Sequence, residues 1–373
     1  MIVHFSDTHL GYSNYNYVDD AGINIREQDF YRAFTQVIDG IIALQPQFVL
    51  HSGDFFHRPS PTNRAVTVAV EQLTRLAEKN IPLVIISGNH STPKTIYTSP
   101  ILKIFSSLKN TYPIYNQQYE TLQFDDIVIH GLPHINDTTI QHQELKKIKV
   151  IGSKKNILLL HTSLGKQFLM DEYGEQVFPS EYVSALPQFD YVALGHWHNF
   201  QQVKGFPNAW YSGSTERMSD SEIGVAKGYC TLTVSDTPIS PTFVTIPTRT
   251  WYKWTIKKCH EKSTEEILAA VEKLVSENNT KDAIIHLNLE AISAGQSLEF
   301  TNFNLKKYFA DALHCNIRRT THYEDKFFNK YDKDNFTRLD QIFEEFVQKK
   351  YTDPTLANKI IQRAKPYFSE FEE

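Results

Sequence analysis

Residues 83–90 read Leu-Val-Ile-Ile-Ser-Gly-Asn-His, an apolar run of four residues that ends in an amide and an imidazole side chain. A short apolar run bounded by glycine is typical of a buried strand. Four other stretches share this design and pass from an apolar run directly into aspartate or histidine: residues 2–9, 48–54, 157–161 and 191–198. The carboxyl ends of strands in an open α/β sheet form the crevice where ligands bind. The five stretches therefore predict one polar site at the strand ends.

The side chains at these strand ends are of the kinds that bind metal ions. They are Asp7, His9, Asp54, Asn89, His90, His161, His196 and His198. Hard or borderline divalent ions take carboxylate, amide and imidazole ligands. A shared carboxylate brings two such ions to about 3.5–4 Å apart, and Asp54 is the natural bridge. The alternative is that polar residues end five strands by coincidence.

Length and composition limit the class of protein. A chain of 373 residues predicts two or three domains. Its net charge of −5 argues against a protein that coats nucleic acid through overall positive charge, but local basic patches remain open. Cys230, Cys259 and Cys315 are too far apart in sequence for a disulfide framework or a thiolate zinc site, which favours a reducing cytosol.

Two further features favour a cytoplasmic protein without a membrane span. The first apolar run begins at Ile2, which leaves no room for a signal peptide. The apolar runs stay well short of the ~20 residues that a spanning helix needs.

The hydrophobic pattern divides the chain into three parts. Residues 1–245 alternate strand-like runs with helical patterns, as in α/β proteins. A helix is expected at 63–79, and another after Ser99, which would be the N-cap, with Pro100 at the first helical position. Prolines at 241 and 247, together with Pro238, indicate a boundary.

The second part, residues 246–324, has a β-α-β pattern. Strands are expected at 251–256 and 283–289, with a helix between them that begins in a capping box of Ser263 and Glu266. A further helix is expected near 305–313. The third part, 325–373, carries two amphipathic helical stripes.

The ordered motifs resemble those of calcineurin-like metallophosphoesterases. His57, three residues after Asp54, and residues 211–217 and 227–229 narrow this resemblance to the SbcD-type DNA double-strand-break repair nucleases. That family includes the meiotic-recombination nucleases, and the archaeal branch is the most similar. The resemblance covers residues 1 to about 290 and implies an α/β fold: a four-layer αββα sandwich with a small α/β cap domain and a helical C-terminal tail.

The resemblance also implies the role of each site residue. One ion would be held by Asp7, His9, Asp54 and His198, and the other by Asp54, Asn89, His161 and His196. His90 would act as general acid, and His57 would orient the phosphate or the scissile nucleotide. The ions would be manganese, although the ligand set also admits iron or zinc.

The implied activity is manganese-dependent 3′-to-5′ exonuclease and single-strand endonuclease cleavage of DNA. The cap would steer DNA ends or single strands to the metals. The C-terminal helices would bind an SMC-like coiled-coil ATPase of the SbcC type, and the helices near 63–79 and 100–108 would form a homodimer. In a prokaryote such a protein would be associated with the nucleoid.

The sequence leaves alternative hypotheses for the function and for several single residues. A superfamily phosphoesterase acting on small phosphodiesters or phosphoproteins is the first alternative, and a DNA-end scaffold with weakened catalysis is the second. Ser91 stands where the family usually has an acidic residue that would orient His90. Tyr12, Tyr15 and Tyr17 are predicted either to stack on bases or to pack their loop. Core or rim positions are the simpler interpretation of four further histidines: His4, His51, His130 and His134.

Overall fold

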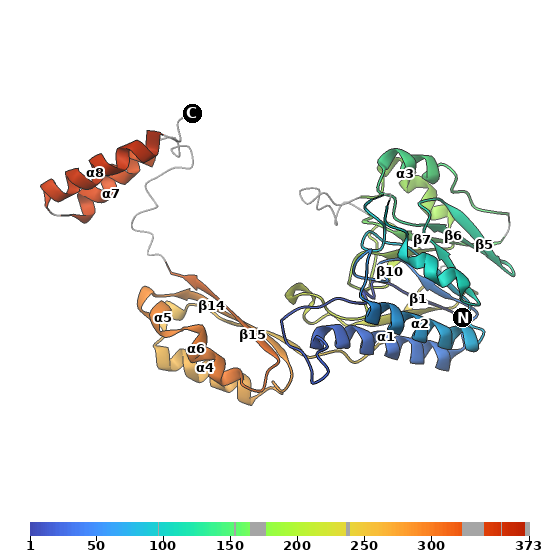
Figure 1. Cartoon of the computed structure of the whole chain (residues 1–373), viewed down its shortest axis with the longest axis horizontal. Helices are drawn as coiled ribbons and strands as arrows, with labels where there is room; N and C mark the ends of the chain where they lie inside the picture. Colours follow the sequence, from blue (N-terminus) through green and yellow to red (C-terminus); the bar gives the residue numbers. More distant parts are fainter. Residues whose placement is uncertain are drawn as a thin grey trace.

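A computed structural model describes residues 1–95, 97–152, 154–164, 177–235, 239–322, 339–351 and 353–369. Two six-stranded sheets form its larger unit (Figure 1). The first sheet consists, in order, of β12 (Thr242–Thr245), β11 (Gly228–Leu232), β1 (Ile2–Phe5), β2 (Val49–His51), β3 (Leu83–Ile86) and β4 (Thr111–Ile114). The second consists of β5 (Glu120–Phe124), β6 (Ile127–Leu132), β7 (Lys155–His161), β8 (Tyr191–Gly195), β10 (Ala209–Tyr211) and β9 (Gln201–Gln202).

Both sheets have parallel centres; the second has two antiparallel edges, and the first has one, at β11 and β12. Strands β1 to β4 run parallel, as do β6, β7, β8 and β10. A central parallel strand is buried on both faces, so its sequence is a continuous apolar run rather than an alternating one. Ile86 and Leu50 of the first sheet pack with Ile129 and Leu159 of the second in one buried cluster between the sheets. This inner layer explains the uninterrupted apolar runs of the sequence.

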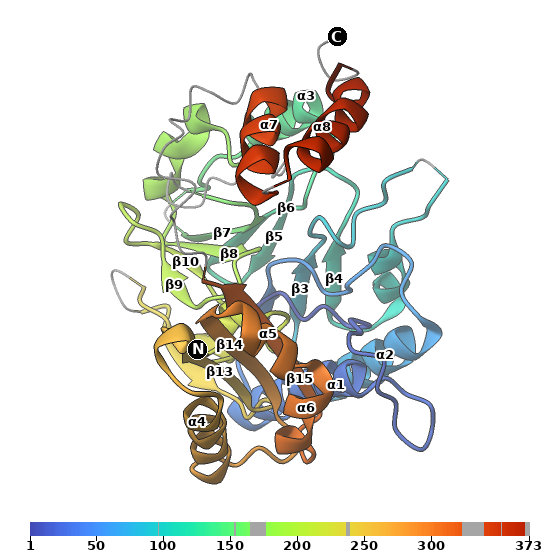
Figure 2. The ribbon, with the colours of Figure 1, turned by 90° about the vertical axis from the view of Figure 1, so that its left-hand side faces the viewer.

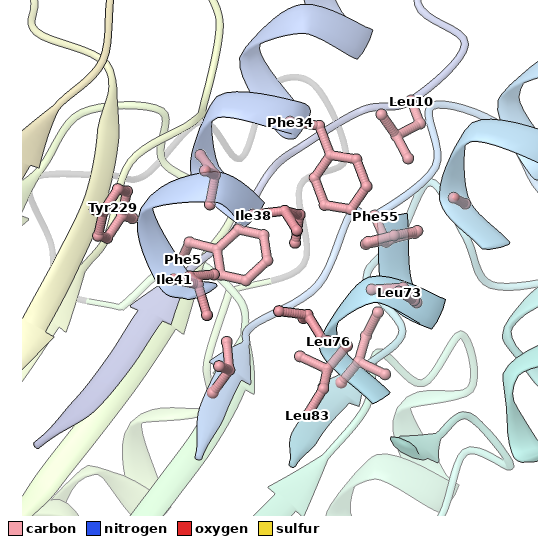
Figure 3. Packing of buried hydrophobic residues seen from close by; sticks show 14 of the residues in the cluster. Phe5, Leu10, Phe34, Ile38, Ile41, Phe55, Leu73, Leu76, Leu83 and Tyr229 are labelled. Atoms are coloured by element: carbon pink, nitrogen blue, oxygen red, sulfur yellow. The ribbon is translucent and has the colours of Figure 1, made fainter. Parts of the chain in front are cut away.

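Helices cover the outer face of each sheet. On the first sheet lie α1 (Ile25–Leu44), α2 (Asn63–Glu78) and the 3₁₀ helix η1 (Ile101–Ser107). Phe34, Ile38 and Ile41 of α1 point at Phe5 of β1 (Figure 3). On the second sheet lie α3 (Thr138–Leu145) and the 3₁₀ helix η4 (Ser180–Gln188), in a separate buried cluster. The four layers predicted as αββα are confirmed.

The segment after Pro100 differs from the prediction. Residues 101–107 form a 3₁₀ helix, and Pro100 occupies the N-cap position instead of the first helical position. A 3₁₀ helix has three residues per turn, so side chains three apart share one face. Leu102 and Phe105 are such a pair, and both are fully buried. Residues 101–107 therefore form a short 3₁₀ helix with one narrow buried face, in place of the predicted helix with Pro100 at its first position.

The smaller unit has three parallel strands, β13 (Trp251–Ile256), β14 (Ile284–Ile292) and β15 (His314–Thr321). Helices α4 (Thr264–Ser276), α5 (Ala294–Glu299) and α6 (Asn302–Lys306), with the 3₁₀ helices η6 (Cys259–Glu261) and η7 (Lys307–Phe309), surround one buried cluster with this sheet. Ser263 and Glu266 form the predicted capping box. The helix expected at 305–313 ends at Phe309, and strand β15, which the sequence analysis missed, follows it.

The two units meet beside the N-terminal end of α1 (Figures 1 and 2). Arg249, just before β13, forms an ion pair with Asp29 of α1 and donates a hydrogen bond to the carbonyl of Asp282. Tyr15 stacks on His314 of β15 with 4.1 Å between ring centroids. Tyr15 therefore packs its loop against the smaller unit, which is the second of the two predictions made for it.

The C-terminal helices form a hairpin of α7 (Leu339–Lys350) and α8 (Pro354–Ser369). Val347, Ala357 and Ile361 are buried between them, and each of the two predicted stripes lies on one of these helices. Residues 325–338 of the predicted tail lie outside the described residues. Within the described parts of the chain, each helix is too short or too polar to cross a membrane.

Candidate metal centre

Each predicted ligand lies at, or just beyond, the carboxyl end of a strand. Asp7 and His9 follow β1, Asp54 follows β2, and Asn89 follows β3, all in the first sheet. From the second sheet, His161 ends β7, and His196 and His198 follow β8. The two sheets pack face to face, so these strand ends meet at one edge of the sandwich. The structure brings all seven side chains into one cluster.

One side of the cluster is built around two imidazoles. The Nε2 atoms of His9 and His198 lie 3.2 Å apart. The same His9 atom is 3.9 Å from Oδ2 of Asp54. Ligand atoms of Asp7, His9 and His198 all lie within 4.8 Å of one another. Two imidazole nitrogens and a carboxylate that converge in this way suit a divalent cation.

The other side is built around His161. Its Nε2 atom lies 3.2 Å from Oδ2 of Asp54 and 3.0 Å from Oδ1 of Asn89. The rings of His161 and His196 have centroids 5.3 Å apart. Asp7, Asp54 and His161 form a second group with ligand atoms within 4.8 Å. Asp54 therefore lies between the two sides, while Asp7 belongs to both groups of converging atoms.

Three glycines of the motifs allow this close approach. A Cβ atom at Gly88 would lie 2.8 Å from Nε2 of His161 and 2.6 Å from the backbone nitrogen of Asp54. A Cβ atom at Gly195 would lie 2.8 Å from Nδ1 of His161, and one at Gly53 would lie 2.6 Å from Cγ of the same ring. Real Cβ contacts essentially never fall below 3.0 Å. The glycines of the Gly-Asp, Gly-Asn-His and Gly-His motifs thus allow the strand ends to pack closely around the His161 ring.

The backbone at the site is strained. Asp7, His9, Asp54 and His196 have φ angles of 51°, 42°, 52° and 106°, in the left-handed region that favours glycine. Residues held in this region cost free energy and cluster at functional sites. The backbone N–H of His196 donates to Asp7 at 3.1 Å, and that of His90 donates to Asp54 at 2.9 Å. These two hydrogen bonds hold the carboxylates in place. The N–H groups that donate them follow strands β8 and β3, so the sheets fix the donors.

Charge coupling links Asp54 and His161. Burial alone would raise the pKa of Asp54, but the charge of His161 and its hydrogen bond hold that pKa well below its usual value. Burial alone would lower the pKa of His161, yet Asp54 raises it to about 9. A cation that takes the place of the His161 proton would be held by the same carboxylate.

His90 and His57 lie beside the cluster and face it. Their rings are stacked with centroids 5.1 Å apart, and each has its centroid within 5.5 Å of that of His9. Nδ1 of His90 lies 2.9 Å from the carbonyl oxygen of His57, so that nitrogen carries the hydrogen and Nε2 stays available. Burial, with the neighbouring charges of His90 and Arg58, lowers the pKa of His57 to about 4.

Ser91 does not contribute to this arrangement. Its side chain is buried and its hydroxyl donates to the carbonyl of Phe56 at 3.4 Å. The carbonyl of His57 holds the His90 ring in place, which is the role that an acidic residue after His90 was expected to fill.

Three of the other histidines are buried core residues. His4 bonds to the Tyr191 hydroxyl at 3.0 Å and to Ser52 at 2.8 Å, which links the two sheets. His51 bonds to Thr8, and His130 lies between Tyr119 and Asn156. His134 is half-buried, and burial with the nearby charge of His161 lowers its pKa to about 4.

Two residues at the site were missed by the sequence analysis. Glu222 accepts a hydrogen bond from Nδ1 of His198 at 3.1 Å, and buried Lys227 forms an ion pair with Glu222. Lys227 lies in residues 227–229, which narrowed the family resemblance but were given no role in the site. Glu222 ends a one-turn 3₁₀ helix, η5 (Asp220–Glu222), and no local sequence pattern links it to His198.

Comparison with known proteins defines the class. Residues 1–200 match the family model described as calcineurin-like phosphoesterase. This range contains every predicted ligand, from Asp7 to His198. The chain belongs to the calcineurin-like phosphoesterase family.

Within that family the chain is similar to archaeal proteins named DNA double-strand break repair protein Mre11. It is 34% identical to that of Methanococcus maripaludis over 59% of this chain and 58% of the relative. It is 33% and 31% identical to those of Sulfurisphaera tokodaii and Sulfolobus acidocaldarius, in each case over 78% of this chain and 74% of the relative. The aligned part thus spans about three fifths to three quarters of these relatives.

Proposed function

We propose that this protein is a metal-dependent DNA nuclease that hydrolyses phosphodiesters at the Asp7–His198 centre. The observation that supports it most is the convergence of two groups of ligand atoms, each within 4.8 Å, around Asp54 and Asp7. Two divalent cations held there would polarise a phosphodiester and lower the pKa of an attacking water molecule. The names of the relatives as DNA repair proteins support DNA as the substrate.

The protein residues would divide the work as follows. His9 and His198, with Asp7, would hold one cation, and His161, with Asn89 and His196, the other, while Asp54 lies between them. The mixed oxygen and nitrogen set suits manganese, and also iron or zinc.

His90, in its doubly protonated form, would deliver the proton on Nε2 to the leaving oxygen and keep the hydrogen on Nδ1. Its other ring nitrogen is fixed by the carbonyl of His57, so the ring points in one direction. His57 is neutral at neutral pH because its pKa lies near 4. It would therefore orient a phosphate oxygen by donating a hydrogen bond and would not act as a charged clamp.

A phosphoesterase for small molecules is the main competitor. The smaller unit favours DNA, because a compact small-molecule enzyme has no need of a second sheet pinned to the catalytic unit through Arg249 and Asp29. Lys253 and Arg318 lie on β13 and β15 of this unit. We propose that residues 246–324 form a cap that guides DNA ends or single strands toward the metals.

The decisive experiment compares His90→Ala with wild type on a labelled DNA duplex and on a small phosphodiester in manganese. The substitution removes the ring but keeps the backbone N–H that donates to Asp54. Both ions should remain bound while cleavage falls ~10²–10⁴-fold. His142→Ala is the matched control, because that histidine lies on helix α3, is partly exposed and pairs with Glu181. Wild type that cleaves only the small phosphodiester would select the competitor, and DNA binding without cleavage would select a scaffold.

Two assemblies complete the proposal. The α7–α8 hairpin exposes Phe346 and Leu356, at 48% and 46%, and we expect it to bind an SMC-like coiled-coil ATPase. Ile104 on η1 is 39% exposed. We expect α2 and η1 to form a homodimer contact. A monomer in light scattering at micromolar concentration would remove the second of these proposals.

A further inference from the structure

The ring of His198 is fixed by a carboxylate on its far side. Its Nε2 faces the metal centre, 3.2 Å from Nε2 of His9. Its Nδ1 lies 3.1 Å from Oε1 of Glu222. An ionised carboxylate only accepts hydrogen bonds, so Nδ1 must be the protonated nitrogen and Nε2 keeps its lone pair for a cation. Glu222 therefore selects the tautomer that can bind metal.

Glu222 is itself held on several sides. Its Oε2 forms an ion pair with Nζ of Lys227, and its Oε1 accepts from the backbone N–H of Met218 at 3.3 Å. The carboxylate is thus ionised and cannot turn freely.

Lys227 connects Glu222 to the backbone of His198. It is only 1% exposed, and a buried ammonium group is costly unless its donors are satisfied. Besides Glu222 it donates to the carbonyl of His198 and to Oγ of Ser214, each at 2.8 Å. Its three donors thus have three acceptors, one on the metal-ligand residue itself. Lys227 therefore fixes the Glu222 carboxylate relative to the backbone of His198.

Two other imidazoles of the centre, those of His161 and His9, have no carboxylate at Nδ1. Nδ1 of His161 bonds to the backbone carbonyl of Ser52 at 2.8 Å, and Nδ1 of His9 is buried without a hydrogen-bond partner. A carboxylate behind a metal-bound imidazole raises its basicity more than a carbonyl does. A carboxylate therefore orients His198 on one side of the centre, whereas a backbone carbonyl orients His161 on the other.

We propose that Glu222, held by Lys227, is a positioning residue for His198 and sets the metal affinity of the His9–His198 side alone. The proposal rests on the dimetal function argued above. Loss of a partner of this kind typically weakens metal binding ~10–100-fold. The His161 side, which is held by the backbone of Ser52, should keep its affinity.

The test is a titration of the full chain with manganese, without DNA, by calorimetry and by the electron paramagnetic resonance of the bound ion. In Glu222→Ala one of two sites should weaken ~10–100-fold, and one equivalent of metal should give the signal of an isolated ion. Lys227→Met should weaken the same site. Glu222→Asp keeps the charge and should recover part of the affinity.

Glu216→Gln is the matched control. Glu216 is also buried and lies in the same segment, but its carboxylate lies 3.7 Å from Arg26 and accepts from the backbone of Arg217, away from the ligands. Wild-type binding at both sites in Glu222→Ala would overturn the proposal. So would equal weakening of both sites, or the same loss in Glu216→Gln. A wild type that binds only one ion would instead overturn the dimetal function, and the proposal with it.

Discussion

Replacing Gly88 with alanine tests the claim that motif glycines exist to bring ligands together. The added Cβ would lie 2.8 Å from Nε2 of His161 and 2.6 Å from the backbone nitrogen of Asp54. To reach an ordinary contact of 3.4 Å these groups must move by roughly 0.6–0.8 Å, several times the ~0.2 Å tolerance of metal–ligand distances. We expect manganese affinity to fall at least ~10-fold, and overpacking to cost ~1–3 kcal/mol of unfolding free energy.

The assay for Gly88→Ala is calorimetric titration with manganese, beside urea unfolding of the metal-free protein. Gly295→Ala is the control, because a Cβ there would meet only Oγ of Ser293 at 4.0 Å, within helix α5. It should leave metal binding unchanged and stability equal or slightly higher. Wild-type manganese affinity in Gly88→Ala would refute the reasoning, because it would mean that the ligands can move apart without loss.

Three further outcomes follow from the buried polar groups. Burial lowers the pKa of His4 and His51 from the ordinary value of 6.5 to about 3. Their contribution to the unfolding free energy is therefore fully present above pH 6.5 and is lost progressively as the pH falls below 6.5. Urea unfolding at pH 5.5 should show ~1.4 kcal/mol less stability per histidine than at pH 7.5, and a flat profile would contradict this. Ser91→Asp places a carboxylate in a site 1% exposed, so the unfolding free energy should fall by ~2 kcal/mol or more, and an unchanged value would show that the site can hydrate. Asp29→Asn leaves Arg26 and Arg249 without their shared carboxylate, which should cost ~3–5 kcal/mol in urea unfolding and speed proteolysis between the two units, whereas wild-type behaviour would show that the ion pairs do not hold them together.

The layered fold was readable from the sequence because its causes are local. The apolar runs at 83–86 and 157–160 are continuous, as strands buried on both faces require. The capping box at Ser263 was equally local and was predicted correctly. The chemistry of the strand ends follows from the same pattern, since parallel strands place their carboxyl ends together.

Contacts between distant segments could not be predicted in this way. Strand β15 reads as polar, with Arg318 and Arg319 in its second half, because much of it is only half-buried. Glu222 reaches His198 from 24 residues away, with strands β9 and β10 between them in the chain. The 3₁₀ form of residues 101–107 depends on which side of Leu102 and Phe105 meets the core. Each of these is decided by packing between elements.

A crystal soaked in manganese and measured at the manganese absorption edge tests the central claim most directly. The account predicts two anomalous peaks about 3.5–4 Å apart, with Asp54 between them, His9 and His198 on one ion, and Asn89 and His161 on the other. A single peak, or two peaks without Asp54 within bonding distance of both, would contradict a dimetal centre and the DNA cleavage proposed for it.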